Sequence, residues 1–149
     1  YDEDEVTLAA LHRMEEKLLD LEDEMTFEAI LDEAKIAVRL ADVWPDVKQV
    51  LDGKYELTPR ARLVIPLPAY HRIRDYMGVQ ELVTPLGRTV TNLDEYIDAC
   101  REIFEGFKAY GAVAFKDQSA YFRSLNYSNP TRAEAEKVFN WFMEMMLSV

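Results

Sequence analysis

Short apolar runs alternate with helical stretches along the chain. The runs at residues 36–41, 61–67 and 112–115 have the length of buried strands. A helical segment or a long crossover follows each run, and no hairpin signal such as Asn-Gly separates them. Parallel strands need such crossovers, whereas antiparallel strands can be joined by a tight turn. The pattern therefore predicts an α/β fold in which the strands run parallel.

The clearest helical signal is the apolar stripe from Leu93 to Phe107, which has the spacing of a helix that lies on a sheet. Thr91 or Asn92 is expected to cap its N-terminus, and Gly111 to end it. Residues 6–25 carry a second, narrower stripe among many charges. We expect an amphipathic helix that packs on its own domain, with a subunit or inter-domain contact as the alternative.

Shorter helices are indicated by caps and stops. The expected segments are residues 27–31 after Thr26 as the N-cap, 46–51 closed by Gly53, 70–77 stopped by Gly78, and a last helix that starts at Thr131. Thr131 and Glu134 have the spacing of a capping box. Residues 80–91, which contain Pro85 and Gly87, are expected to form a loop or an extended connection.

Composition excludes some classes of partner. A net charge of −11 over 149 residues argues against nucleic acid and against anionic membrane surfaces. The single cysteine, Cys100, allows no internal disulfide and makes the cytoplasm the expected compartment. It falls on an apolar helical stripe and is expected to be buried filler. No apolar run is long enough to span a bilayer. The first residues lack an initiator Met and the last lack a polar tail, so we expect a piece of a longer protein.

The densest functional signal lies at residues 107–125. A helix ends at Gly111, a short apolar run follows, and polar residues then begin abruptly at Lys116. In parallel α/β proteins the carboxyl end of a strand is the place where ligands bind. A lysine directly after a buried strand needs an anionic partner or solvent near it. Lys116 is therefore a candidate site residue.

Residues 111–116 (GAVAFK) and 120–125 (AYFRSL) resemble the amidohydrolase-related branch of the metal-dependent hydrolases. Residues 27–42 and 62–66 give weaker support, so the resemblance covers residues 26–149. It implies one segment of a (β/α)₈ TIM barrel with parallel strands, preceded by the N-terminal helix of residues 1–25. Three strands do not close a barrel, which typically needs roughly 250 residues.

The resemblance implies a metal-dependent hydrolase that acts on a small anionic, amide or ester substrate. In some relatives the equivalent of Lys116 is carboxylated and bridges two metal ions, so Lys116 is the expected catalytic and metal residue. The expected cofactor is a divalent metal ion, zinc first. Only His12 and His71 are present and neither belongs to a His-x-His pair. Most metal ligands are therefore expected outside this chain.

Each candidate residue has a structural alternative. Lys116 could contact an anionic substrate directly, or form an ion pair with Asp117 or Asp42. Asp42 could equally orient a ligand or cap a helix.

Arg123, with Tyr121 two residues before it, could bind a substrate carboxylate, or could be a surface arginine that covers an apolar neighbour. His71 follows a strand and has a possible substrate-side role. His12 lies in the acidic first helix, where a solvated or salt-bridged role is expected.

A second function of a different class remains open. The chain could be a non-catalytic α/β module whose acidic N-terminal helix and Met-rich end mediate assembly, including formation of a homo-oligomer. On the enzymatic hypothesis the partner is a small-molecule substrate. Neither hypothesis involves nucleic acid or a membrane.

Overall fold

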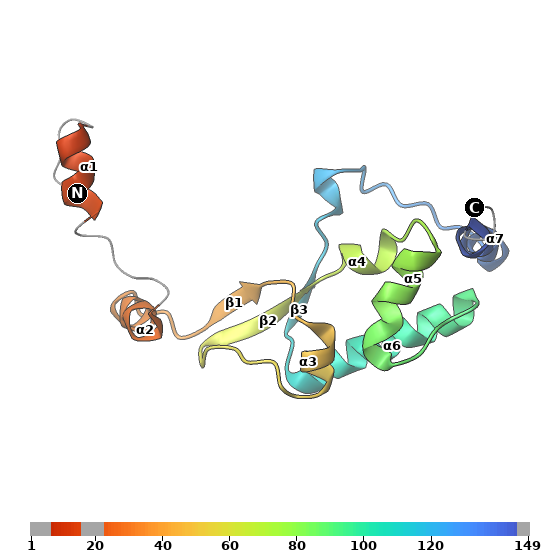
Figure 1. Ribbon diagram of the computed structural model, residues 1–149, viewed down its shortest axis with the longest axis horizontal. Helices are drawn as coiled ribbons and strands as arrows, with labels where there is room; N and C mark the ends of the chain where they lie inside the picture. The colour runs from red at the N-terminus through yellow and green to blue at the C-terminus, as the bar shows by residue number, and fades with distance from the viewer. Residues whose placement is uncertain (1–6, 16–22, 146–149) are drawn as a thin grey trace. The chain divides into compact units, whose positions relative to one another are not determined.

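The computed structural model describes residues 7–15 and 23–145 (Figure 1). The chain divides into two compact units, Tyr1–Arg39 and Leu40–Val149. We consider each unit by itself. The described part contains no helix with the length and apolar character that crossing a bilayer requires.

In the first unit, helix α1 spans Leu8–Glu15 and helix α2 spans Glu24–Glu33. The middle of the helix predicted for residues 6–25 lies outside the described residues. Its predicted end at Met25 is wrong, and so is the predicted N-cap Thr26. The N-cap is Asp23, whose carboxylate accepts a hydrogen bond from the Thr26 backbone N–H at 2.9 Å. Because this carboxylate pairs with a backbone N–H that the helix leaves free, the helix begins three residues earlier than predicted.

A sheet of three strands forms the framework of the second unit. Strands β1 (Arg39–Asp42), β2 (Ala61–Pro66) and β3 (Ala114–Lys116) lie in the order β1-β2-β3. Strands β2 and β3 are parallel, with Val64 opposite Ala114 and Pro66 opposite Lys116. The predicted α/β class with parallel strands is confirmed. That the sheet belongs to a larger barrel stays a prediction.

Helices separate the strands as expected for crossover connections, and a further helix follows β3. They are α3 (Val47–Leu51), α4 (Pro68–His71), α5 (Tyr76–Val83), α6 (Leu93–Tyr110) and α7 (Arg132–Glu144), with 3₁₀ turns at Thr84–Leu86 and Ser119–Tyr121. Asn92, not Thr91, caps α6. The capping box of Thr131 and Glu134 is present at the start of α7. Asn92 and Thr131 are the N-caps because the side-chain oxygen of each accepts a hydrogen bond from the backbone N–H of the third helical residue.

The helix predicted at residues 70–77 and the loop predicted at residues 80–91 are wrong in part. Helix α4 ends at His71, and α5 begins after Asp75 and continues to Val83. The Asp75 carboxylate accepts from the Gly78 N–H at 2.8 Å, so Gly78 lies in the first turn and does not stop the helix. Burial of Val79 and Val83 then holds α5 in place.

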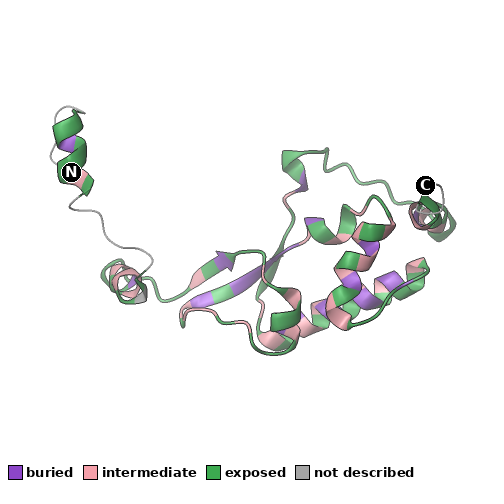
Figure 2. Cartoon of the chain, in the orientation of Figure 1, coloured by how far each residue is buried: buried purple, intermediate pink, exposed green. Residues whose placement is uncertain are grey.

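Helix α6 carries the core of the unit, with a buried stripe along one side (Figure 2). Ile103 and Phe107 pack with Val50, Leu63 and Ile65, which joins α6 to α3 and to β2. Burial of each large apolar side chain contributes about 1.5–3 kcal/mol. A second cluster joins α5, α6 and α7 and contains Val79, Val83, Val90, Tyr96, Ala99 and Phe139.

Gly111 ends α6 in the left-handed conformation, with φ of 105°. The backbone N–H groups of Gly111 and Ala112 both reach the carbonyl of Phe107, at 3.2 and 2.9 Å. This closes the last turn and directs the chain into β3, as the sequence predicted. The core and this turn together fix the carboxyl ends of β2 and β3 at one edge.

Candidate functional site at the carboxyl edge of the sheet

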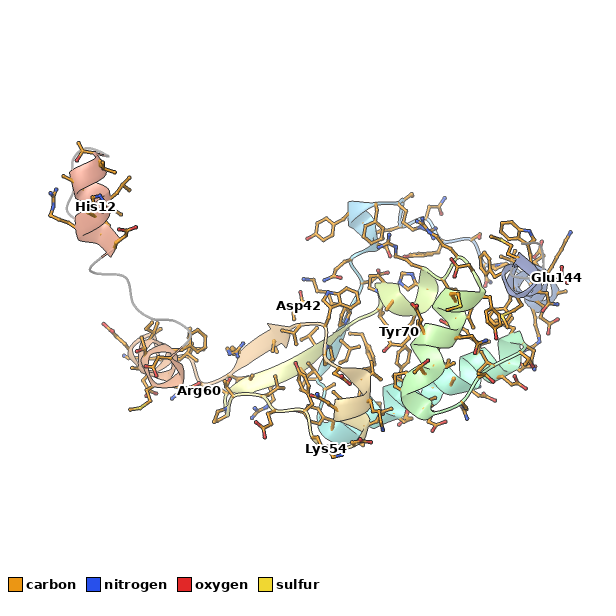
Figure 3. The ribbon with its side chains drawn as sticks, in the orientation of Figure 1. His12, Asp42, Lys54, Arg60, Tyr70 and Glu144 are labelled. Carbon is orange, nitrogen blue, oxygen red and sulfur yellow. The ribbon has the colours of Figure 1, made fainter. Side chains whose placement is uncertain are left out.

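The polar segments after β2 and β3 leave the sheet at the same edge because the two strands are parallel. The Leu67 N–H donates to the carbonyl of Lys116 at 2.9 Å, which extends the pairing one residue beyond β2. Helix α4, which carries Tyr70 and His71, starts directly after this bond. Asp42 ends β1 and also belongs to this edge; Figure 3 labels Asp42 and Tyr70. We call these segments the carboxyl edge.

Lys116 forms an ion pair with Asp42 through its Nζ atom and the Asp42 Oδ2 atom. The hydrogen bond to Asp42 raises the pKa of the Lys116 amine, and the nearby Tyr121 adds to this. Both side chains keep contact with solvent, with 45% and 34% of their surface exposed. The Asp42 alternative for Lys116 is therefore present in the structure. This ion pair favours the charged ammonium form of Lys116, whereas carboxylation of a lysine requires the neutral amine.

Asp117 is the centre of a second polar group. One carboxylate oxygen accepts from the Ser119 N–H at 2.9 Å and faces His71 Nε2 at 3.4 Å, and the other accepts from the Tyr127 hydroxyl at 3.0 Å. The pKa of Asp117 is lowered to about 2, first by the Ser119 side chain and the Ser119 N–H and then by Tyr127 and His71. The Ser119 side chain faces the carboxylate without an aligned hydrogen bond. Asp117 is thus a carboxylate at neutral pH and orients His71.

Arg123 joins the same group through Tyr127. Its guanidinium lies over the Tyr127 ring, 4.4 Å from the centroid, and its Nε donates to the Ser124 carbonyl at 3.0 Å. The His71 ring meets Tyr127 edge-on, with centroids 6.3 Å apart. The structure therefore links His71, Asp117 and Arg123 through one tyrosine.

Tyr121 projects into solvent and is 82% exposed. It lies close enough to Lys116 to affect the pKa of the amine. The four residues predicted for the site are thus distributed between two groups. Lys116 and Tyr121 belong to the Asp42 group, and His71 and Arg123 belong to the Asp117 group. His12, in the first unit, contacts the exposed Glu15 carboxylate at 3.3 Å, as expected of a surface residue.

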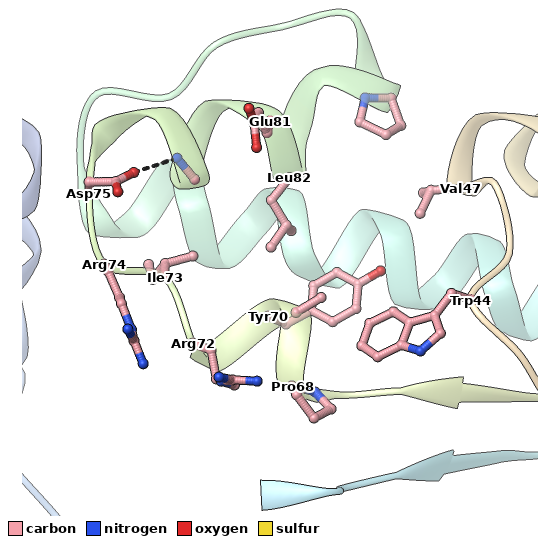
Figure 4. Close-up of a pocket in the computed structure, with 13 residues that line it drawn as sticks. Trp44, Val47, Pro68, Tyr70, Arg72, Ile73, Arg74, Asp75, Glu81 and Leu82 are labelled. Atoms are coloured by element: carbon pink, nitrogen blue, oxygen red, sulfur yellow. Dashed lines mark hydrogen bonds between the residues drawn. The ribbon is translucent and has the colours of Figure 1, made fainter. Parts of the chain in front are cut away.

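A groove of about 560 Å³ adjoins the carboxyl edge beside α4 (Figure 4). Trp44, Tyr70, Ile73 and Leu82 are among its apolar lining residues, and Arg72 and Arg74 are its cations. The Arg72 guanidinium also lies 3.8 Å from the centroid of the Phe122 ring. We call this cavity the α4 groove.

Sequence reasoning missed Tyr127, Trp44 and the two groove arginines. Tyr127 lies in a segment without periodicity, so no pattern places it beside Asp117. A weak signal existed for the groove, because His71, Arg72 and Arg74 form a basic cluster in an acidic chain.

The described residues do not fit a complete metal centre. No group of three or more His, Cys, Asp or Glu side chains that could hold an ion occurs among them. At the carboxyl edge, Asp42 is paired with an ammonium, and Asp117 already accepts from an amide and a hydroxyl. Oxygen and nitrogen atoms that could bind a metal ion are present, but they are engaged in hydrogen bonds and ion pairs.

Comparison with protein-family models, with curated proteins and with solved structures finds no match for this chain. The proposal below therefore rests on the site and on the sequence resemblance.

Proposed function

We propose that the chain is a segment of a hydrolase barrel of the amidohydrolase type, acting on a small anionic, amide or ester substrate. The observation that supports it is that two polar groups lie at the carboxyl edge of a parallel sheet, His71 with Asp117 in one and Lys116 with Asp42 in the other. That edge is where α/β enzymes carry out their chemistry. The sequential order of the parallel strands is also the order in such a barrel.

In this proposal His71 acts as the general base. Its Nε2 atom faces the Asp117 carboxylate, which leaves Nδ1 to accept a proton from water. The water oxygen attacks the carbonyl carbon of the substrate, and the bond to the amine or alcohol breaks. The leaving group then takes the proton from His71. Lys116 and Arg123 hold the substrate anion, and Tyr121 covers it.

A divalent metal ion, zinc first, stays part of the proposal through the sequence resemblance alone. Since the described residues do not complete its ligand set, its ligands would lie largely outside them, and no step above depends on it. A cytoplasmic location is likewise proposed, supported by the single cysteine.

The test is hydrolysis of a panel of carboxylate-bearing amides and esters by the purified protein. His71→Asn should lower kcat by about 10²-fold or more, the usual effect of removing a general base. His12→Asn is the matched control, because His12 lies in the first unit on an exposed helix face. Turnover that is equal in both variants, or absent from the whole panel, would contradict the proposal. Metal analysis of the same samples tests the cofactor.

The alternative function, assembly without catalysis, has one observation in its favour. Val138, Trp141 and Met145 lie on one side of the α7 segment, and they are 52%, 59% and 43% exposed. These three apolar side chains are thus only partly covered within their unit. If they mediate association, Trp141→Glu should reduce the mass of the particle measured by light scattering. Equal masses for the unchanged protein and for Trp141→Glu would count against this function.

A further inference from the structure

The α4 groove has the size and lining of a small-molecule site. Its volume of about 560 Å³ lies in the usual range of roughly 300–1,000 Å³ for such cavities. Trp44 is 64% exposed although it is a large aromatic residue. Tyr70 beside it is fixed by an edge-on contact with Phe104, with centroids 4.8 Å apart. Two aromatic side chains thus offer ring surface to a flat ligand.

The cations of the groove are available to an anion. Arg74 makes no ion pair or hydrogen bond with another residue in the described part of the chain. Arg72 is held over the Phe122 ring at 3.8 Å, a contact that orients the guanidinium and leaves its charge unneutralised. Because the whole chain has a net charge of −11, anions approach it only where cations are gathered.

The acidic residues of the groove do not cancel these cations. The Asp75 carboxylate is engaged as the N-cap of α5, where it accepts from the Gly78 N–H at 2.8 Å. Glu81 lies on α5, and in Figure 4 it is drawn apart from Arg72 and Arg74, which extend to the same side. One side of the groove is therefore cationic and its floor is apolar.

We propose that the α4 groove binds a small planar molecule that carries a carboxylate. The planar body lies against Trp44 and Tyr70, and the carboxylate is bound by Arg72 and Arg74. Guanidinium groups bind carboxylates through paired, charge-assisted hydrogen bonds. The Tyr70 hydroxyl is neutral at physiological pH, as an ordinary tyrosine hydroxyl is, so it does not repel the anion. The groove is proposed as a binding site in its own right, because the anion contacts of the proposed function, Lys116 and Arg123, do not line it.

Isothermal titration calorimetry with 2-naphthoate on the purified protein tests the site. 2-Naphthalenemethanol has the same ring system without the charge and should bind about tenfold more weakly or worse, as expected for loss of charged hydrogen bonds. Cyclohexanecarboxylate keeps the charge without the flat ring and should bind several-fold more weakly.

Two variants and two matched controls locate the binding. Arg74→Gln should weaken 2-naphthoate about tenfold, and Trp44→Ala should weaken it several-fold. Arg101→Gln removes an exposed arginine of α6 that pairs with Asp98, and Trp141→Ala removes the exposed tryptophan of α7; both should leave the affinity unchanged. Circular dichroism checks that each variant is folded.

The groove assignment is overturned if 2-naphthoate shows no binding at millimolar concentrations, or if Arg74→Gln and Trp44→Ala bind it as the unchanged protein does. Its failure is separable from that of the proposed function. Binding at the groove without hydrolysis of any ester or amide would remove the enzyme and keep the site. Hydrolysis without any binding of 2-naphthoate would do the reverse.

Discussion

Lys116 and Asp42 form an ion pair although the strands that they end, β3 and β1, are not neighbours in the sheet. Strand β2 lies between them, so the lysine side chain spans the carboxyl edge of the central strand. The ion pair connects the carboxyl ends of the two outer strands at the place where the substrate is proposed to bind. It is also partly exposed, with 45% and 34% of the two side chains open to solvent.

Replacement of Lys116 separates a structural role from a functional one. Exposed ion pairs contribute little to stability, so Lys116→Met should melt close to the unchanged protein. On the proposed function kcat/KM should fall about tenfold or more, since the substrate anion loses one of its two cationic partners. Lys108→Met is the control, because Lys108 pairs with Glu105 on the outer side of α6. Equal turnover in both variants would reduce Lys116 to a structural residue.

Arg123→Ala tests substrate binding by the Asp117 group. If Arg123 binds the substrate equally in the ground state and the transition state, KM should rise about tenfold while kcat stays constant. Arg101→Ala serves as the control on α6. An unaltered KM would indicate that the stacking of Arg123 on Tyr127, at 4.4 Å, is its whole role.

Asp117 should make stability depend on pH in the acid range. Its pKa falls from the ordinary 3.8 to about 2 in the folded protein, first through the Ser119 side chain and backbone N–H. A carboxyl group with a depressed folded pKa stabilises the fold above its unfolded pKa, and this contribution disappears as pH falls from about 4 to about 2.

The measurement is urea unfolding of the unchanged protein and of Asp117→Asn from about pH 7, where the carboxyl is ionised in both the folded and the unfolded state, down to about pH 2. The difference in stability between the two should shrink below about pH 4. Asp98→Asn removes an exposed carboxylate on α6 and is the control. A difference that stays constant down to the lowest pH would show that Asp117 titrates normally.

Elements with a long pattern and the capping box at Thr131 could be predicted from sequence, whereas the N-caps of α2 and α5 could not. The stripe of α6 and the left-handed stop at Gly111 are encoded by spacing and by one residue type, so both were predicted. The starts of α2 and α5 depend on Asp23 and Asp75, single carboxylates that compete with other possible caps nearby. Only the folded backbone decides which of them accepts the hydrogen bond.

The candidate site divides in the same way. Lys116 was predicted directly after a buried strand, but it is the last residue of β3, and all three residues of β3 are exposed. Its ion pair with Asp42 was one of the alternatives that the sequence left open. Tyr127 is bonded to Asp117 across a segment with no regular structure between them except one 3₁₀ turn. No spacing rule applies to such a segment, so this partner could not be predicted.

Packing between α3 and α6 should be limited by Gly106. A Cβ atom added at this position would collide with the Leu51 side chain of α3. Alanine in a helix interior is favoured over glycine by roughly 1 kcal/mol, whereas overpacking costs roughly 1–3 kcal/mol. We expect Gly106→Ala to lower the free energy of unfolding by about 1 kcal/mol, measured by urea denaturation.

The double variant Gly106→Ala with Leu51→Ala identifies the cause. If the collision with Leu51 is responsible, alanine at position 106 should be stabilising once Leu51 is truncated, so the two changes are not additive. Gly78→Ala is the control, because its added Cβ would lie at an ordinary 3.4 Å from the Asp75 carboxylate, and it should not destabilise the protein. A Gly106→Ala protein that is more stable than the unchanged one would mean that the Leu51 side chain rotates away at little cost.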